Sequence, residues 1–288
     1  MSKAILRTLA YSDIFDYPLT APEVAKYLIS DTEVTVDTIQ DNLLILTDSK
    51  RIYTDGGFYF LKKREKIVEI RKEREKRSGQ KLIIAQRTAE KLKIIPFIKM
   101  IGITGALAMN NCQENDDIDL LIVTGANSLW LTRFLVILLS PLLGIKRRKP
   151  KEKTIKNKIC FNLFLDENYL KIEPENLFLA HEICQVKPIF DKDNTYNRFI
   201  KGNKWVFNFL PNAKKNYNLQ FTIYNSKKKH LISFLNILAY KLQYLYMKPK
   251  ITNEKISRYQ AFFHPGNTKF EVEKKYRQSL SLLGLDNP

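Results

Sequence analysis

Apolar residues near the start of the chain recur every three or four positions, and this spacing predicts three short helices. The first covers residues 3–15, the second begins at Thr20, and the third covers residues 36–47. Thr20 and Glu23 have the spacing of a capping box, and Pro22 suits the first turn of the second helix. In the third helix the positions expected to face inward are Ile39, Leu43, Leu44 and Leu46.

The pattern changes to short aromatic-rich runs between residues 51 and 60. A Gly56-Gly57 turn separates the two runs, which is typical of a β-hairpin. Three helices followed by a hairpin resemble a winged helix-turn-helix over residues 1–61. The exposed side of the third helix is acidic and amidic, with Asp37, Gln40, Asp41, Asn42 and Asp48. Because phosphate contacts supply most DNA affinity, this favours packing or protein contact over the alternative of a DNA-binding regulator.

Residues 62–93 mix both charge signs at helical spacing, which predicts a solvated helical connector that Gly79 divides in two. The following core, residues 94–168, contains apolar runs at 97–104 and 158–167 that are typical of buried strands. Residues 129–145 are strongly apolar but interrupted by Arg133 and Pro141, so we expect a buried helix rather than a membrane span. Residues 169–288 show mainly helical spacing and predict a helical C-terminal domain.

Two carboxylates, Asp117 and Asp119, open another apolar run. Residues two apart in a strand point to the same face, so both carboxylates project together while the alternate residues face the core. Two oxygen donors at a strand end form half of a magnesium site, which substrate phosphates complete. Gly105, twelve positions before Asp117, ends the preceding run and lets backbone N–H groups approach a phosphate. Together these residues predict a site for phosphate and metal.

This arrangement resembles the nucleotidyltransferase superfamily that includes DNA polymerase beta and the kanamycin nucleotidyltransferases. The family pattern is a Gly-Ser turn, a short helix and Asp-x-Asp on the next strand. The matching residues are Gly105-Ala106 and the run from Asp116 to Leu120. The alternative without a functional role is that these aspartates are a solvated strand start that caps an ordinary βαβ turn.

The resemblance implies a mixed α/β multidomain protein with a winged helix, a mixed nucleotidyltransferase-type sheet and a helical C-terminal region. It also implies Mg²⁺ held by Asp117 and Asp119, and a nucleoside triphosphate cradled by Thr104, Gly105 and Ala106. The expected activity is transfer of a nucleotidyl group to an acceptor hydroxyl. The acceptor stays open among a protein, a small molecule and an RNA end.

Two positions depart from the family pattern. Ala106 stands where the family has serine, and Thr104 is the nearest replacement. Asn162 stands where a third carboxylate is expected, and an amide cannot take a proton. Asp166 has the same strand parity as Asn162 but lies about 13 Å farther along. These departures support a second hypothesis, a catalytically impaired protein that binds nucleotide or nucleic acid as a regulator.

The chain has 48 Lys and Arg against 30 Asp and Glu, a net charge of +18 that attracts polyanions. Lysine-rich composition is also typical of low-GC genomes, so only part of this charge bears on function. Lys146, Arg147 and Arg148 follow the apolar helix. Beside the metal site they would bind a triphosphate or a nucleic-acid backbone, and otherwise they belong to a surface loop.

The three cysteines, Cys112, Cys160 and Cys184, are far apart and odd in number. This pattern, with no secretory leader or membrane segment, predicts a reducing cytoplasmic location and no membrane partner. His181-Glu182 lacks the second histidine of a zinc-protease helix, so we expect His181 to be structural. Aromatic residues of the C-terminal region fit core packing better than base stacking.

Overall fold

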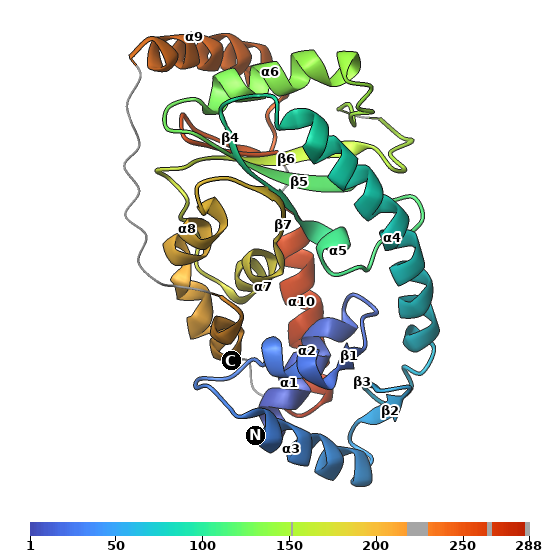
Figure 1. The fold of residues 1–288 in the computed structure, drawn as a ribbon. Coiled ribbons are helices and arrows are strands. Elements are labelled where there is room, and N and C mark those ends of the chain that lie inside the picture. Colours follow the sequence, from blue (N-terminus) through green and yellow to red (C-terminus); the bar gives the residue numbers. More distant parts are fainter. Residues whose placement is uncertain (151, 218–229, 264–266, 286–288) are drawn as a thin grey trace.

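The computed structural model describes residues 1–150, 152–217, 230–263 and 267–285. Figure 1 shows a small helical unit at the N-terminal end and a larger mixed sheet covered by helices on both faces. The long helix α4 (Ile67–Leu92) runs along one side and connects the two parts. The protein is therefore mixed α/β, as the sequence predicts.

The N-terminal unit contains the predicted helices and hairpin. Its helices are α1 (Ser2–Asp13), α2 (Ala21–Lys26) and α3 (Val36–Asp48), and its sheet has the order β1 (Leu19–Thr20), β3 (Phe58–Phe60), β2 (Tyr53–Asp55). The capping box of α2 is formed, since the Thr20 N–H donates to the Glu23 carboxylate at 2.9 Å. Leu44 is 61% exposed, so its predicted inward position is wrong. The winged-helix resemblance itself stays a prediction.

Helix α4 corrects two expectations about residues 62–93. It is a single helix through Gly79 rather than two helices. It is also not a solvated connector, because Arg71 and Lys81 are almost completely buried along one side. Arg71 binds Glu23 of α2, and the Lys81 ammonium donates to the Glu114 carbonyl at 3.3 Å and to Asn157 Oδ1 at 2.9 Å. The exposed side of α4 carries charges of both signs, so the sequence pattern alone does not reveal the buried side.

Replacing Gly79 with alanine is expected to stabilise the protein by about 0.5–1 kcal/mol, because alanine favours the interior of a helix. A Cβ added at this position would meet no atom within 4 Å. Urea unfolding of the full chain measures the change. As a control, Gly57→Ala should destabilise, because Gly57 has φ +82° in open space. A loss of stability in Gly79→Ala would contradict this account of α4.

The main sheet has six strands in the order β7-β4-β5-β6-β9-β8. Strands β5 and β6 are parallel, whereas the other neighbours are antiparallel. The strands are β4 (Ile98–Ile103), β5 (Ile118–Thr124), β6 (Ile159–Asp166), β7 (Lys187–Asp191), β8 (Lys255–Ile256) and β9 (Gln260–Phe262). Residues 169–288 are mainly helical, as predicted, but they also contribute three strands to the sheet and are therefore not a helical domain separate from the core.

Helices pack on both faces of this sheet. One face meets α4, α6 (Leu129–Leu142) and α9 (His230–Met247), and it carries Ile118, Leu120 and Ile122 of β5 as predicted. Leu121 and Val123 on the other face are equally buried. That face meets the N-terminal unit and the remaining helical segments. These are α7 (Leu177–Gln185), α8 (Thr195–Gly202), η1 (Lys204–Asn208), η2 (Pro211–Asn216) and α10 (Asn267–Leu282). The short helix α5 (Gly105–Ala108) contacts both α4 and α7, and its Leu107 and Ala108 belong to the hydrophobic cluster of the first face.

The two ends of the chain share one hydrophobic core. Tyr276 and Leu280 of α10 belong to the same cluster as Ile5 and Leu9 of α1, and α10 lies between the sheet and the N-terminal unit (Figure 1). Residues 1–61 are therefore fixed against the C-terminal region. Within the described part of the chain, no helix combines the length and apolar character needed to cross a bilayer.

Candidate functional site

The acid pair lies at the start of β5, and its two side chains are on one face, as their spacing predicts. Asp119 is paired in register with Cys160 of the parallel strand β6. One ligand atom from each of Asp117, Asp119 and Cys160 lies within 4.8 Å of the others. These three side chains form a candidate metal-binding cluster.

Cys160 is the member of this cluster that the sequence did not reveal. Its thiol is hydrogen-bonded to Asp119, and burial followed by the negative charges of Asp119 and Asp117 raises its pKa. The sequence-based prediction is that Asn162, rather than Cys160, lies beside the acid pair. The register of the parallel pair sets the position of Cys160, because Ile118 pairs with Ile159 and Asp119 with Cys160. Asn162 lies two residues farther along, at a bulge where Leu120 pairs with Phe161 and Leu121 with Leu163.

Asn162 nevertheless lies nearby and lines the same cavity as Asp119. Its Nδ2 donates to Thr104 Oγ1 at 3.5 Å. Its Oδ1 is buried and, among the described residues, meets no hydrogen-bond donor. Asp166 lies at the far end of β6, where it accepts a hydrogen bond from the Asn127 N–H at 2.6 Å. It is therefore too distant to supply the third acid, as predicted.

The glycine turn touches the acid pair directly. Gly105 has φ +62° and follows β4 at the start of the short helix α5. A Cβ at this position would lie 2.9 Å from Asp119 Oδ2. The neighbouring Thr104 N–H donates to the Asp119 carbonyl at 3.1 Å, which ties the turn to β5. Both the backbone conformation and the close approach therefore require glycine at position 105.

One of the three predicted basic residues reaches the acids. The Arg148 guanidinium donates to Asp117 Oδ2 at 2.8 Å in a partly exposed ion pair. Arg147 forms a parallel bridge with Ile159, and the pKa of Arg133 on α6 is lowered first by burial and then by the positive charge of Arg147. Lys146 is exposed, and the described residues show no contact between it and the acids. Of the three, Arg148 is thus the one that the described structure places against the acids, and its phosphate-binding role stays a prediction.

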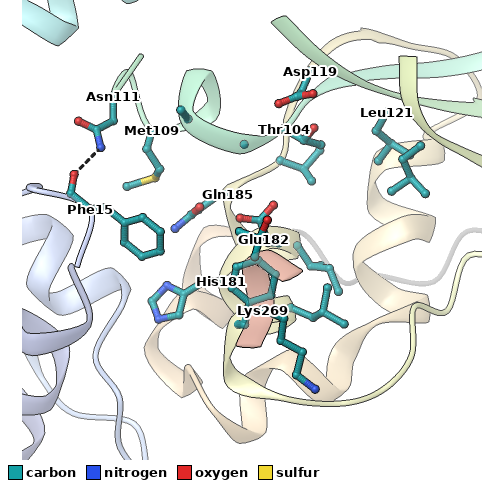
Figure 2. A pocket seen from close by; sticks show the side chains of 18 of the residues that line it. Phe15, Thr104, Met109, Asn111, Asp119, Leu121, His181, Glu182, Gln185 and Lys269 are labelled. Carbon is teal, nitrogen blue, oxygen red and sulfur yellow. Dashed lines mark hydrogen bonds between the residues drawn. The ribbon is translucent and has the colours of Figure 1, made fainter. Parts of the chain in front are cut away.

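A cavity of about 420 Å³ opens beside Asp119. Figure 2 shows Asp119 and Thr104 on one side of it and His181, Glu182 and Lys269 on the other. Its walls come from the N-terminal unit, the sheet, α7 and α10, and they are mainly apolar. The aromatic and apolar lining includes Tyr11, Phe15, Tyr17, Tyr27, Met109, Leu121, Leu163, Phe178, Phe199 and Phe262.

Helix α7 directs one side toward the cavity, with Phe178, His181, Glu182 and Gln185 at helical spacing. His181 stacks on Tyr11 with ring centroids 4.0 Å apart, and burial lowers its pKa to about 3. It is a packed residue, as predicted, but it also forms part of the cavity wall. The pKa of Glu182 is raised to about 7, first by burial and then by the negative charge of Asp119. Glu182 is therefore a second acid facing the site that sequence reasoning missed.

His181 and Glu182 are expected to give opposite pH dependences of the free energy of unfolding. His181 stabilises fully above pH 6.5, and this contribution is lost as the pH falls toward 3, because the unfolded chain binds the proton first. Glu182 contributes fully below pH 4.5 and loses its contribution as the pH rises to about 7. The two slopes therefore offset each other between pH 4.5 and 6.5.

Single variants should reveal each slope in urea unfolding with a chelator present. Between pH 6.5 and 5, His181→Phe is expected to gain about 2 kcal/mol relative to the wild-type protein, at about 1.4 kcal/mol per pH unit. Phenylalanine keeps the stack on Tyr11. Glu182→Gln is expected to lose stability relative to wild type over the same interval. Parallel pH profiles for all three proteins would show that these two groups do not titrate as described.

The comparisons with known proteins give no relative from which to infer a function. No protein-family model matches the chain, and no curated protein matches its sequence significantly. The chemistry of the site therefore rests on its own geometry.

Proposed function

We propose that this protein is a Mg²⁺-dependent nucleotidyltransferase that transfers a nucleotidyl group from a nucleoside triphosphate to an acceptor hydroxyl. The observation that carries the proposal is the contact between the Gly105 turn and the acid pair, next to a cavity. A glycine turn gives backbone N–H groups close access to phosphate oxygens. Paired carboxylates at the same place suit a hard divalent cation that also binds those phosphates.

The residues at the site fit such a cation. Asp117 and Asp119 supply charged oxygens, and Asn162, which lines the same cavity as Asp119, supplies a neutral buried amide oxygen. Bound here, Mg²⁺ would neutralise charge on the triphosphate and align it for in-line attack. Arg148, which pairs with Asp117, becomes available to a phosphate oxygen when the carboxylate turns to a cation.

In the proposed reaction the acceptor hydroxyl attacks the α-phosphorus, and the bond from this phosphorus to the bridging oxygen of the β-phosphate breaks. Pyrophosphate leaves, and the hydroxyl proton passes to Glu182, whose pKa near 7 suits it to accept a proton. The backbone of Thr104, Gly105 and Ala106 lies against the β- and γ-phosphates. Arg148 offsets the charge that develops in the transition state.

The cavity favours a small acceptor with an apolar body. Its lining is mainly aromatic and aliphatic, and the acids on its wall, Asp119 and Glu182, repel a polyanion such as an RNA end. Of the described lining residues, Lys269 is the one that carries a positive charge at neutral pH. An uncharged or cationic hydroxyl compound therefore fits better than a nucleic acid.

Thermal unfolding of the full chain with each nucleoside triphosphate, with and without Mg²⁺, tests the binding step. Ligand at about 100 times its dissociation constant stabilises by about 2.7 kcal/mol, which raises the melting temperature by several degrees. Asp117→Asn should lose this increase. Asp116→Asn is the matched control, because Asp116 lies outside the cluster and its carboxylate accepts a hydrogen bond from the Gln113 N–H at 2.7 Å. An equal increase in Asp117→Asn and wild type would overturn the metal site.

A second hypothesis, nucleotide binding without turnover, is supported by Asn162 at the place expected for a third acid. The two hypotheses differ in the release of pyrophosphate. Incubation with α-labelled triphosphate and a panel of apolar hydroxyl compounds separates them. Stabilisation by nucleotide and Mg²⁺ without any labelled product across the panel favours the binding protein.

A further inference from the structure

Helix α9 packs on the protein through a side that contains two amides, Asn236 and Gln243, among the apolar residues Ala239, Tyr240 and Met247. Asn236 is 1% exposed, and its Oδ1 accepts hydrogen bonds from the N–H groups of Trp130 and Leu131 at 2.7 and 3.1 Å. About two turns farther along, Gln243 Nε2 donates to the Trp130 carbonyl at 2.8 Å. Helices of water-soluble proteins usually bury their most apolar side.

The side of α9 that faces away from the protein is also apolar. Leu231 is 72% exposed, Leu242 62% and Leu245 67%. Helix α6, which lies against α9, exposes Phe134, Leu138 and Leu142 in the same way, and Leu142 is 79% exposed. We define the apolar face as these side chains of α6 and α9: Phe134, Leu138, Leu142, Leu231, Phe234, Leu235, Leu238, Leu242, Leu245 and Tyr246.

Figure 1 shows α6 and α9 together at the end of the molecule opposite the N-terminal unit. Ten large apolar side chains on two adjacent helices greatly exceed the scattered exposure that is normal for a surface. Extended exposed apolar surface of this kind marks contact with a membrane or with another protein. The hydrogen bonds of Asn236 and Gln243 show that this orientation of α9 is built into the fold.

The charges around the apolar face select between these partners. Neither α6 nor α9 contains an aspartate or a glutamate. The exposed charged residues within α9 and in η3 (Lys248–Lys250) directly after it are lysines: Lys241, Lys248 and Lys250. A second copy of the chain would bring these lysines against one another without an acidic partner. An anionic lipid surface supplies the missing negative charge, worth about 1 kcal/mol per basic residue near the surface.

We propose that the apolar face attaches this protein to the surface of an anionic membrane. Helices α6 and α9 lie in the plane of the interface, with their leucines in the boundary between headgroups and acyl chains and their lysines among the headgroups. This geometry requires no spanning helix, in agreement with the described structure. It also revises the sequence-based expectation that the protein has no membrane partner.

Attachment leaves the candidate active site accessible. The cavity beside Asp119 is lined by Leu121 and Leu163, which lie on the face of the sheet turned away from α6 and α9. The membrane proposal rests on the surface of α6 and α9 and does not depend on the proposed function. An experiment that overturns membrane attachment therefore leaves the proposed nucleotidyl transfer untouched, and the reverse also holds.

Flotation of the full chain with lipid vesicles tests the proposal. The protein is expected to bind vesicles of phosphatidylcholine with added phosphatidylserine, and to bind pure phosphatidylcholine at least tenfold more weakly. The double variant Leu238→Gln/Leu242→Gln should reduce the partition coefficient at least tenfold, because it removes two apolar side chains that enter the membrane boundary. Lys241→Gln/Lys248→Gln should weaken binding to anionic vesicles while preserving the weak binding to neutral ones.

The matched control is Leu44→Gln/Ile45→Gln on α3, which removes two leucine-sized side chains of similar exposure, 61% and 59%, at the other end of the molecule. This variant should bind vesicles like the wild type. Sedimentation of the lipid-free protein tests whether the apolar face instead binds a second copy of the chain. A dimer that Leu238→Gln/Leu242→Gln dissociates, without binding of the wild type to vesicles, would overturn the proposal in favour of contact between two copies. Equal flotation of the wild type and this double variant would overturn it as well.

Discussion

Replacing Asp119 with asparagine is expected to reduce nucleotidyl transfer at least about 100-fold, because the metal site supplies several kcal/mol of transition-state stabilisation. Asn retains the shape of the side chain but not the charge that holds a divalent cation beside the Gly105 turn. The fold should remain intact, since the amide oxygen still accepts a hydrogen bond from Cys160. The rate of pyrophosphate release from a γ-labelled triphosphate, at saturating triphosphate and Mg²⁺, measures the effect.

Asp116→Asn serves as the control for this prediction, because it removes a neighbouring charge outside the cluster. It should retain most of the activity. Full activity of Asp119→Asn would show that the acid pair does not hold the catalytic metal. A catalytically silent wild-type protein would instead support the binding hypothesis.

Cys160 provides a test of which metal the cluster prefers. Mg²⁺ selects oxygen ligands, whereas zinc and softer metals also bind sulfur. Cys160→Ala should therefore leave the Mg²⁺ concentration dependence of nucleotide binding nearly unchanged. A large loss of metal affinity in this variant would assign the cluster to a thiophilic ion. Titration of metal-free protein with each cation measures the difference.

Replacing Arg71 with methionine is expected to lower the free energy of unfolding by about 3–5 kcal/mol, the usual cost of breaking a buried ion pair from one side. The Arg71 side chain is 6% exposed, and its guanidinium donates to Glu23 at 2.7 and 2.9 Å. The same group lies 4.2 Å from the centroid of the Tyr17 ring. Methionine fills similar volume but leaves Glu23 without its cation. Urea unfolding with fluorescence and circular dichroism measures the loss.

Arg77→Met on the same helix is the matched control. Arg77 pairs with Glu73 at 3.0 Å, and both side chains are largely exposed, 41% and 65%. Such a surface pair contributes less than about 1 kcal/mol. If both variants lose the same small amount of stability, Arg71 does not fasten α4 to the N-terminal unit.

Local sequence signals predicted the elements that depend on neighbouring residues. The capping box at Thr20, the hairpin at Gly56-Gly57 and the strands on either side of Gly105 all occur as expected. The same-face arrangement of Asp117 and Asp119 also follows from strand alternation alone. These features are determined within a few residues, so the chain carries them without reference to the rest of the fold.

Helix α4 shows where local reasoning fails. Its mixed charges indicate a solvated helix, yet Arg71 and Lys81 are buried because their partners come from residues 23 and 114–157. The strand β7 was missed for a related reason. Its five residues, Lys187–Asp191, have no distinct strand pattern, and pairing with β4 is what makes them a strand.

The sequence by itself determined the acid pair, the glycine turn and the strands on either side of that turn. Only the tertiary structure decided that Cys160 lies beside Asp119, that Glu182 faces the same cavity, and that α9 turns its leucines outward. Parallel register, the docking of one helix on a sheet and the direction of a buried amide all depend on contacts between distant segments. Periodicity within one segment cannot specify those contacts, because it fixes which residues share a face but not what that face meets.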